Sequence, residues 1–153
     1  MINKNKLIQN KLNLDLEYYK KISGKYKIAD KNGLGKEYIL DSDILIFEGE
    51  YKNRRRNEKG KEYDNRNLII EGEYINGKKN GKGKEYYFGE LIFEGEYLNG
   101  VRHGKRKLYW DKILKFEGEF IDGKRNGKGK EYDYNNEVIF EGEYLYIKRL
   151  TVK

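Results

Sequence analysis

A five-residue block recurs along the chain at nearly constant spacing. FEGEY or a close variant begins at Phe47, Ile70, Phe93, Phe116 and Phe140, so successive copies lie 23, 23, 23 and 24 residues apart. A weaker copy, ISGKY, begins at Ile22. Spacing this regular predicts one structural unit that is repeated along the chain, with each unit stabilised mainly by its neighbours.

A second block follows each copy of the first. It is a pair of glycines separated by one residue, and a tyrosine follows it in every unit. The pair is intact in the units that begin at Ile22, Ile70 and Phe116, and it is changed in the other two, at Glu58 and Arg106. These tyrosines are Tyr38, Tyr63, Tyr86, Tyr109 and Tyr132. We therefore divide the chain into an N-terminal cap or half-repeat at 1–21, five repeats, and a C-terminal half-repeat cap at 140–153. The repeats span 22–46, 47–69, 70–92, 93–115 and 116–139. A short N-terminal helix is the alternative at the start of the chain, because Ile8, Leu12, Leu16 and Tyr19 also fit a helical stripe.

The repeated block has the alternation of a half-buried strand. In Phe93-Glu-Gly-Glu-Tyr97 the aromatic residues and glycine alternate with two glutamates. The strand ends in Asn99-Gly100, a dipeptide that favours a tight hairpin turn, and a return strand follows. Frequent glycine and a single alanine disfavour helix. The sequence predicts an all-β fold, an elongated single-layer ladder of antiparallel β-hairpins.

The central glycines of the first block have a predicted structural role. Because glycine has no Cβ, the ring of a neighbouring phenylalanine or tyrosine can lie flat on the backbone at that position. We expect such packing at Gly49, Gly72, Gly95, Gly118 and Gly142. With 22 aromatic residues in a chain that is only 37% apolar, an aromatic layer would form a thin core.

The run from Phe93 to Gly100, continued by Arg102-His-Gly-Lys105, resembles the MORN repeat (membrane occupation and recognition nexus), and so does the run from Phe116 to Gly129. The resemblance covers about residues 22–147. It implies a ladder of antiparallel hairpins in a scaffolding, cytoskeletal or membrane-associated protein. Glutamate precedes the second-strand tyrosine at Glu62, Glu85 and Glu131, where an aromatic residue is more usual. That feature is nearer to the MORN-like variant of some bacterial proteins.

Charge is also distributed by the repeat. The chain has 33 Lys and Arg against 26 Asp and Glu, a net charge of +7, and most cations fall in the turn and return strand. Stacked units would align them as a basic rim beside glutamate columns headed by Glu48 and Glu50. The candidate partner-binding or lipid-binding residues of this rim are Lys78, Lys79, Arg102, Lys105, Arg106, Lys107, Lys124, Arg125 and Lys128.

Three interpretations of the rim compete. The first is that lysine and glutamate pair across strands and keep the sheet soluble. The second is attraction to acidic membrane lipid, to which each basic residue contributes about 1 kcal/mol. The third is nucleic acid. We favour lipid over nucleic acid, because the tyrosines are committed to packing and the glutamates would repel a phosphate backbone.

The sequence offers little for catalysis. It has no cysteine, one histidine and three Ser or Thr residues, and none of the three lies in the unit that contains the histidine. We expect no enzyme activity, no cofactor and no metal site, and we read His103 as a turn residue. No apolar run is long enough for a signal peptide or a membrane-spanning helix, so we expect a cytoplasmic protein with peripheral association to cytoskeleton or membrane.

The leading hypothesis is therefore a non-catalytic scaffold for protein–protein interaction. Exposed residues such as Leu98, Leu145 and Tyr146 would anchor a partner, and the end strands could pair two copies of the chain as a homodimer. The alternative is a peripheral membrane module that binds acidic phospholipids or phosphoinositides through the basic rim. A remoter option is a bacterial MORN-like protein that acts through protein contacts in a toxin or phage-defence setting.

Overall fold

A computed structural model describes residues 24–29, 31–40, 42–146 and 148–150 of the chain. The predicted N-terminal cap at 1–21 and its helical alternative lie outside these residues. The described residues form twelve strands: β1 (Lys25–Ala29), β2 (Gly33–Ile39), β3 (Leu45–Lys52), β4 (Arg55–Asp64), β5 (Asn67–Ile75), β6 (Lys78–Tyr87), β7 (Glu90–Leu98), β8 (Val101–Trp110), β9 (Ile113–Ile121), β10 (Lys124–Tyr132), β11 (Val138–Leu145) and β12 (Lys148–Leu150).

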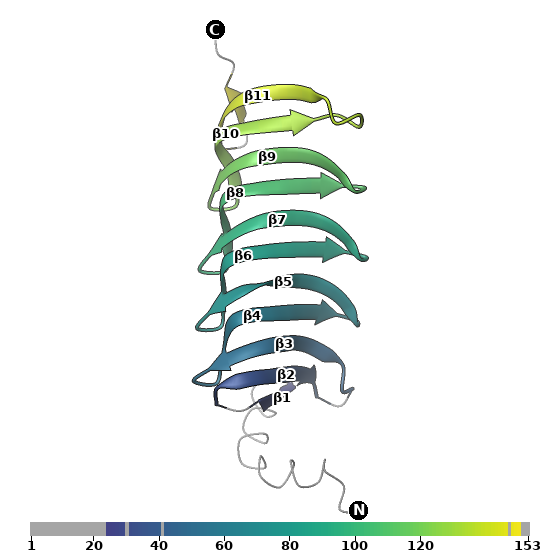
Figure 1. Ribbon diagram of the computed structural model, residues 1–153, viewed down its shortest axis with the longest axis vertical. Helices are drawn as coiled ribbons and strands as arrows, with labels where there is room; N and C mark the ends of the chain where they lie inside the picture. Colours follow the sequence, from purple (N-terminus) through teal and green to yellow (C-terminus); the bar gives the residue numbers. More distant parts are fainter. Residues whose placement is uncertain (1–23, 30, 41, 147, 151–153) are drawn as a thin grey trace, which may run out of the picture.

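The strands build one open antiparallel sheet whose order follows the sequence from β1 to β12. Figure 1 shows the resulting elongated stack, with successive hairpins laid one above another. The predicted all-β ladder of hairpins is therefore confirmed. No helix of the described residues could cross a bilayer.

Turns alternate between two long edges of the ladder. Turns within a repeat, such as β5–β6 and β7–β8, lie at the left in Figure 1, and we call this side the hairpin edge. Turns between repeats, such as β6–β7 and β8–β9, lie at the right and form the linker edge. In the β5–β6, β7–β8 and β9–β10 turns a left-handed residue precedes a glycine, as at Asn99 and Gly100 with φ of 53° and 90°.

Glycines meet across the strands along the middle of the sheet. Gly118 in β9 faces Gly129 in β10, and a Cβ at Gly118 would lie 2.7 Å from the Gly129 Cα. The same Cβ would lie 2.7 Å from the Cζ of Phe116, whose ring leans over the backbone. Side chains other than hydrogen therefore do not fit there without displacing either backbone or ring.

The sheet has two different faces. The aromatic face carries the buried hydrophobic side chains, which are Phe47, Tyr51, Ile70, Tyr74, Phe93, Tyr97, Phe116, Phe120 and Tyr144. Their rings pack edge to face: Phe116 contacts Phe120 of its own strand and Tyr144 of β11 at centroid distances of 5.2 and 5.3 Å. We call the opposite side the groove face. Glutamates and lysines line it, because residues alternate between the faces along each strand.

Candidate binding surfaces

An Arg–Glu–Tyr site recurs along the aromatic face, and we call a layer that contains one a regular layer. In the best-formed one, Glu85 accepts hydrogen bonds from the Tyr97 hydroxyl and from Arg102, at 2.7 Å from Nε and 2.5 Å from Nη2. The Arg102 guanidinium also lies 4.5 Å from the centroid of the Phe93 ring. Burial alone would raise the pKa of Glu85, but the bonds from Arg102 and Tyr97 outweigh burial and hold it below the ordinary value.

The same arrangement recurs along the ladder. Tyr51 and Arg56 donate to Glu37, and Tyr144 and Arg149 donate to Glu131, which also accepts from Arg125. The arginine stacks on the phenylalanine of its own unit, with Arg56 4.0 Å from the Phe47 centroid and Arg125 4.3 Å from that of Phe116. In the unit where Ile70 replaces the phenylalanine, the arginine is also replaced, by Lys79. The glutamates that depart from the commonest repeat pattern thus act as acceptors for tyrosine and arginine.

The nine cations predicted to share one rim are divided between the two faces, which corrects the single basic stripe. The side chains of Lys79, Arg102, Arg106 and Arg125 lie on the aromatic face, opposite Tyr74, Tyr97, Gly118 and Phe120. The side chains of Lys78, Lys105, Lys107, Lys124 and Lys128 lie on the groove face, opposite Ile75, Glu119, Glu117, Ile121 and Glu143. The reason is the two-residue period of a strand, which sends neighbouring cations to opposite faces.

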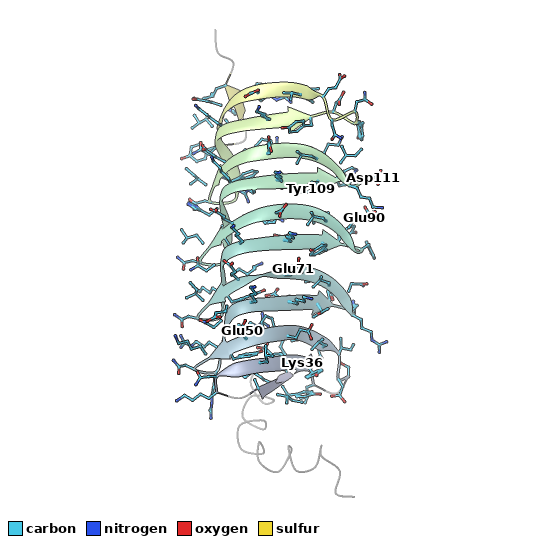
Figure 2. All side chains as sticks on the ribbon, in the orientation of Figure 1. Lys36, Glu50, Glu71, Glu90, Tyr109 and Asp111 are labelled. Atoms are coloured by element: carbon cyan, nitrogen blue, oxygen red, sulfur yellow. The ribbon has the colours of Figure 1, made fainter. Side chains whose placement is uncertain are left out.

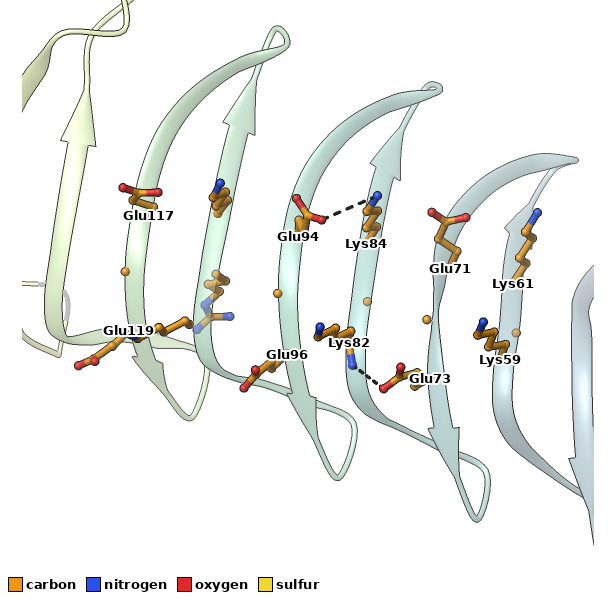
Figure 3. A pocket seen from close by; sticks show the side chains of 18 of the residues that line it. Lys59, Lys61, Glu71, Glu73, Lys82, Lys84, Glu94, Glu96, Glu117 and Glu119 are labelled. Carbon is orange, nitrogen blue, oxygen red and sulfur yellow. Dashed lines mark hydrogen bonds and ion pairs between the residues drawn. The ribbon is translucent and has the colours of Figure 1, made fainter.

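Two columns of alternating charge run along the groove face. The first column is Lys36, Glu48, Lys61, Glu71, Lys84, Glu94, Lys107, Glu117, Lys130 and Glu141. Figure 3 shows part of it beside a second column that includes Lys59, Glu73, Lys82, Glu96 and Glu119. The predicted separate glutamate columns are therefore corrected as well, since lysine and glutamate alternate within each column.

The columns are held by specific bonds. In the first, Lys130 pairs with Glu141 at 3.1 Å, and the Tyr86 hydroxyl donates to Glu71 at 2.6 Å. Burial, and then the bond to Glu71, raise the pKa of Tyr86 to about 12. In the second, the backbone N–H of Lys82 donates to Glu73 at 2.9 Å. The second-strand tyrosines thus belong to the groove face and not to the aromatic layer, which sequence analysis did not anticipate.

A long groove lies between the columns. Its volume is about 1630 Å³, and its floor is formed by the row of facing glycines. Four apolar residues end the first strands of successive hairpins beside the second column, and each is between 45% and 51% exposed. We call them the apolar margin: Ile75, Leu98, Ile121 and Leu145.

The linker edge carries a separate group of exposed aromatic residues. Tyr87 and Phe88 lie at the β6–β7 turn, Trp110 at the β8–β9 turn and Tyr134 at the β10–β11 turn, and all four are 66% to 78% exposed. Glu90 and Asp111, labelled in Figure 2, mark two of these turns. The four residues fall outside the repeated blocks, so the repeat pattern gave no reason to single them out. We call this group the aromatic linker edge.

The comparisons with known proteins agree with the geometry. The family profile described as MORN repeat matches residues 71–88, 93–111 and 116–138. The chain is a MORN-repeat protein. MORN repeats indicate a repeat scaffold, of a kind that generally interacts with proteins or membranes. No curated protein matches this MORN-repeat chain.

Among solved structures, a mutant of S. aureus TarM in complex with fondaparinux, alpha-GlcNAc-glycerol and UDP is similar at 13% identity and a TM-score of 0.35. The likeness covers 88% of the MORN-repeat chain and 24% of the TarM chain. At that score it carries no argument about function. Within the described residues, no group of three His, Asp or Glu side chains could hold a metal ion.

Proposed function

We propose that this MORN-repeat protein is a non-catalytic scaffold that binds another protein along its groove face. The observation that carries the proposal is the apolar margin, which lies beside a groove lined by lysines and glutamates of alternating sign. Residues such as Leu98 and Ile121 offer apolar anchors at successive hairpins, about 10 Å apart given the spacing of two strands. Protein interfaces commonly combine a few such anchors with polar surroundings of both signs.

The charge order of the columns favours a protein over a polyanion. Lys84 lies opposite Glu71 in one neighbouring strand and Glu94 in the other, and this order repeats along the ladder. A phosphate backbone following the groove would meet a carboxylate at every second strand, which opposes the phosphate contacts that dominate nucleic-acid affinity. A protein surface can place an opposite charge against each column residue in turn.

Site-specific photocrosslinking tests the scaffold function. A photoreactive phenylalanine analogue at Leu98 is compared with the same analogue at Lys112, which lies on the opposite edge. We expect a discrete crosslinked protein only at Leu98, lost on competition with excess unlabelled wild-type chain. A competitor carrying Leu98→Asp and Ile121→Asp should not compete. Equal crosslinking at both positions, or equal competition by both competitors, would contradict binding at the apolar margin.

Peripheral membrane binding is the second candidate, and the aromatic linker edge favours it. Trp, Tyr and Phe side chains are suited to the boundary between lipid headgroups and acyl chains. Lys112 lies in the same turn as Trp110, and the Lys115 Nζ is 3.3 Å from the centroid of the Tyr134 ring. We propose this edge as the membrane contact in preference to the predicted basic rim, because Arg102 and Arg125 of that rim pair with glutamates.

The single tryptophan of the chain makes the membrane candidate simple to test. On addition of vesicles of phosphatidylcholine with phosphatidylserine, we expect Trp110 emission to shift to shorter wavelength as the indole leaves water. A variant with Phe88→Ser and Tyr134→Ser should lose the shift, whereas Lys105→Glu on the groove face should keep it. No shift at low salt would exclude the linker edge as a membrane contact.

A further inference from the structure

One layer of the aromatic face departs from all the others. Arg106 in β8 occupies the position held by Gly83 in β6 and Gly129 in β10, and it faces Gly95 and Gly118. Arg106 is only 3% exposed, and its guanidinium nitrogens Nε, Nη1 and Nη2 have no hydrogen-bond partner. A buried guanidinium without an acceptor is destabilising, because its N–H groups lose their hydrogen bonds to water and form none within the protein.

Two further changes coincide with Arg106. Leu108 occupies the position that Glu85 and Glu131 hold in neighbouring units, and Phe120 occupies that of Tyr97. The layer has therefore lost both the carboxylate and the hydroxyl of the Arg–Glu–Tyr site, while gaining a second arginine. The three changes together leave the Arg106 guanidinium against apolar side chains with no acceptor of its own.

The carboxylates nearby are already occupied. Glu85 accepts from Arg102 and Tyr97, and Glu131 accepts from Arg125 and Tyr144. Lys105 and Lys107 lie on the other face. Burial and the neighbouring Arg102 lower the pKa of Arg106 to about 9, which reflects how poorly this surrounding accommodates its charge.

The ring of Phe120 lies directly over the Arg106 guanidinium. The Arg106 guanidinium carbon lies 3.1 Å from the centroid of the Phe120 ring and 5.7 Å from that of Phe93. In the regular layers the tyrosine at this position is hydrogen-bonded to a glutamate, as Tyr144 is to Glu131. Phe120 has no hydroxyl to make such a bond, so its ring is the one that can turn aside to admit a ligand.

We propose that Arg106 binds a carboxylate supplied by another protein, the side chain of a glutamate or aspartate inserted beside Leu108. The inserted group would take the place that the chain's own glutamates occupy in the other layers. A planar carboxylate matches the guanidinium fork, which can donate two parallel hydrogen bonds to it. This acidic-peptide site is on the aromatic face, so it is independent of the groove contact proposed above.

Side-chain NMR of Arg106 tests the proposal. Full-length ¹⁵N-labelled protein is titrated at low salt with an acetylated, amidated hexaglutamate peptide, and the Arg106 Nε–H resonance is followed. We expect a saturable shift for the wild type. A hexaglutamine peptide of the same length should give none, and neither should inorganic phosphate at equal concentration.

Two variants complete the test. Leu108→Glu supplies an internal carboxylate and should weaken the peptide's apparent affinity at least tenfold. Arg106→Gly restores the residue of the other units and should abolish the peptide-dependent shifts of the surrounding backbone amides. No saturable shift in the wild type would overturn the proposal, as would unchanged affinity in both variants. A phosphate shift as large as that of the peptide would overturn the assignment to carboxylate.

Discussion

Two layers of one aromatic face treat an arginine in opposite ways. Around Tyr97, Arg102 lies across a phenylalanine ring and shares Glu85 with the tyrosine hydroxyl. Around Phe120, Arg106 lies under the ring with no carboxylate. The folds of the two layers are the same, so the backbone ladder does not depend on either solution. The two layers differ in hydrogen bonding. The guanidinium of Arg102 has its acceptor within the chain, whereas that of Arg106 has none and, in our proposal, binds a carboxylate of another protein.

The largest expected effect comes from forcing the irregular residue into a regular layer. In Gly83→Arg, the new Cβ would start 2.8 Å from Cε2 of Tyr97, whose hydroxyl is held by Glu85. We expect the free energy of unfolding to fall by about 4 kcal/mol, from overpacking and from a second buried cation. Urea denaturation measures the change, with Lys82→Arg on the groove face as a control expected to stay within about 0.5 kcal/mol. Similar midpoints for the two variants would erase the distinction between the layers.

Removing the shared carboxylate tests the regular layer directly. Glu85→Ala leaves the Arg102 guanidinium and the Tyr97 hydroxyl without their acceptor. Because Arg102 retains contact with solvent, we expect a loss of about 2 kcal/mol, less than for a fully buried pair. The exposed Glu96→Ala in the same strand layer should change unfolding by about 0.5 kcal/mol or less. A negligible loss for Glu85→Ala would show that the site contributes no stability.

Converting the irregular layer to the regular one should stabilise the protein. The triple variant Arg106→Gly, Leu108→Glu and Phe120→Tyr recreates the acceptor and the hydroxyl and removes the unpaired cation. We expect a gain of about 1.5 kcal/mol by thermal or urea unfolding. Phe120→Tyr alone should cost about 1 kcal/mol, because its hydroxyl would be buried beside Leu108. A triple variant less stable than the wild type would indicate that Arg106 stabilises its layer by stacking alone.

A backbone irregularity gives a smaller effect. Glu58 has φ of 55°, whereas Gly81, Gly104 and Gly127 occupy the same position in other units with φ of 107°, 68° and 90°. Glu58→Gly removes the strain of a left-handed residue and should raise the free energy of unfolding by about 1 kcal/mol. The matched Lys59→Gly, one residue later, should lower it by about 0.5 to 1 kcal/mol. Equal losses from both substitutions would contradict the strain.

The finest distinction between the layers is their response to acid. The pKa of Glu85 is held below its ordinary value of 4.5, chiefly by Arg102 and Tyr97 acting against burial. A lowered pKa in the native state contributes stability above pH 4.5, and that stability is lost as the pH falls through the native pKa. Stability measured from pH 7 to pH 3 should therefore decline less steeply in Glu85→Gln. Parallel profiles for Glu85→Gln and wild type would contradict a shifted carboxyl.

Much of the ladder could be predicted from the repeat alone. The alternation in Phe93-Glu-Gly-Glu-Tyr97 and the Asn99-Gly100 turn define a strand and a hairpin by local rules. The prediction that rings lie on the backbone is correct at Gly49, Gly118 and Gly142, where the nearest ring belongs to the phenylalanine two residues earlier. It is wrong at Gly72 and Gly95, because Ile70 replaces the phenylalanine beside the first and Arg106 occupies the space beside the second.

The surfaces could not be predicted as completely, because they depend on register between strands. Alternation along β6 sends Glu85 to the aromatic face and Tyr86 to the groove face, and the register with β7 sets their partners, Phe93 and Leu91. The cations of the return strands follow the same alternation, so the residues of the predicted basic rim lie on both faces of the sheet. The three changes around Arg106 are visible in the sequence, but only the fold shows that they meet in one layer.

The charge columns also constrain how such a chain can change in length. Because lysine and glutamate alternate from strand to strand, loss or gain of one strand would place two lysines or two glutamates opposite each other in each column at that point. Removal of two adjacent strands leaves every opposite-sign neighbour in place. Insertion or deletion of whole hairpins therefore preserves the alternation of charge along the columns. Insertion or deletion of an odd number of strands creates a repulsive contact between like charges.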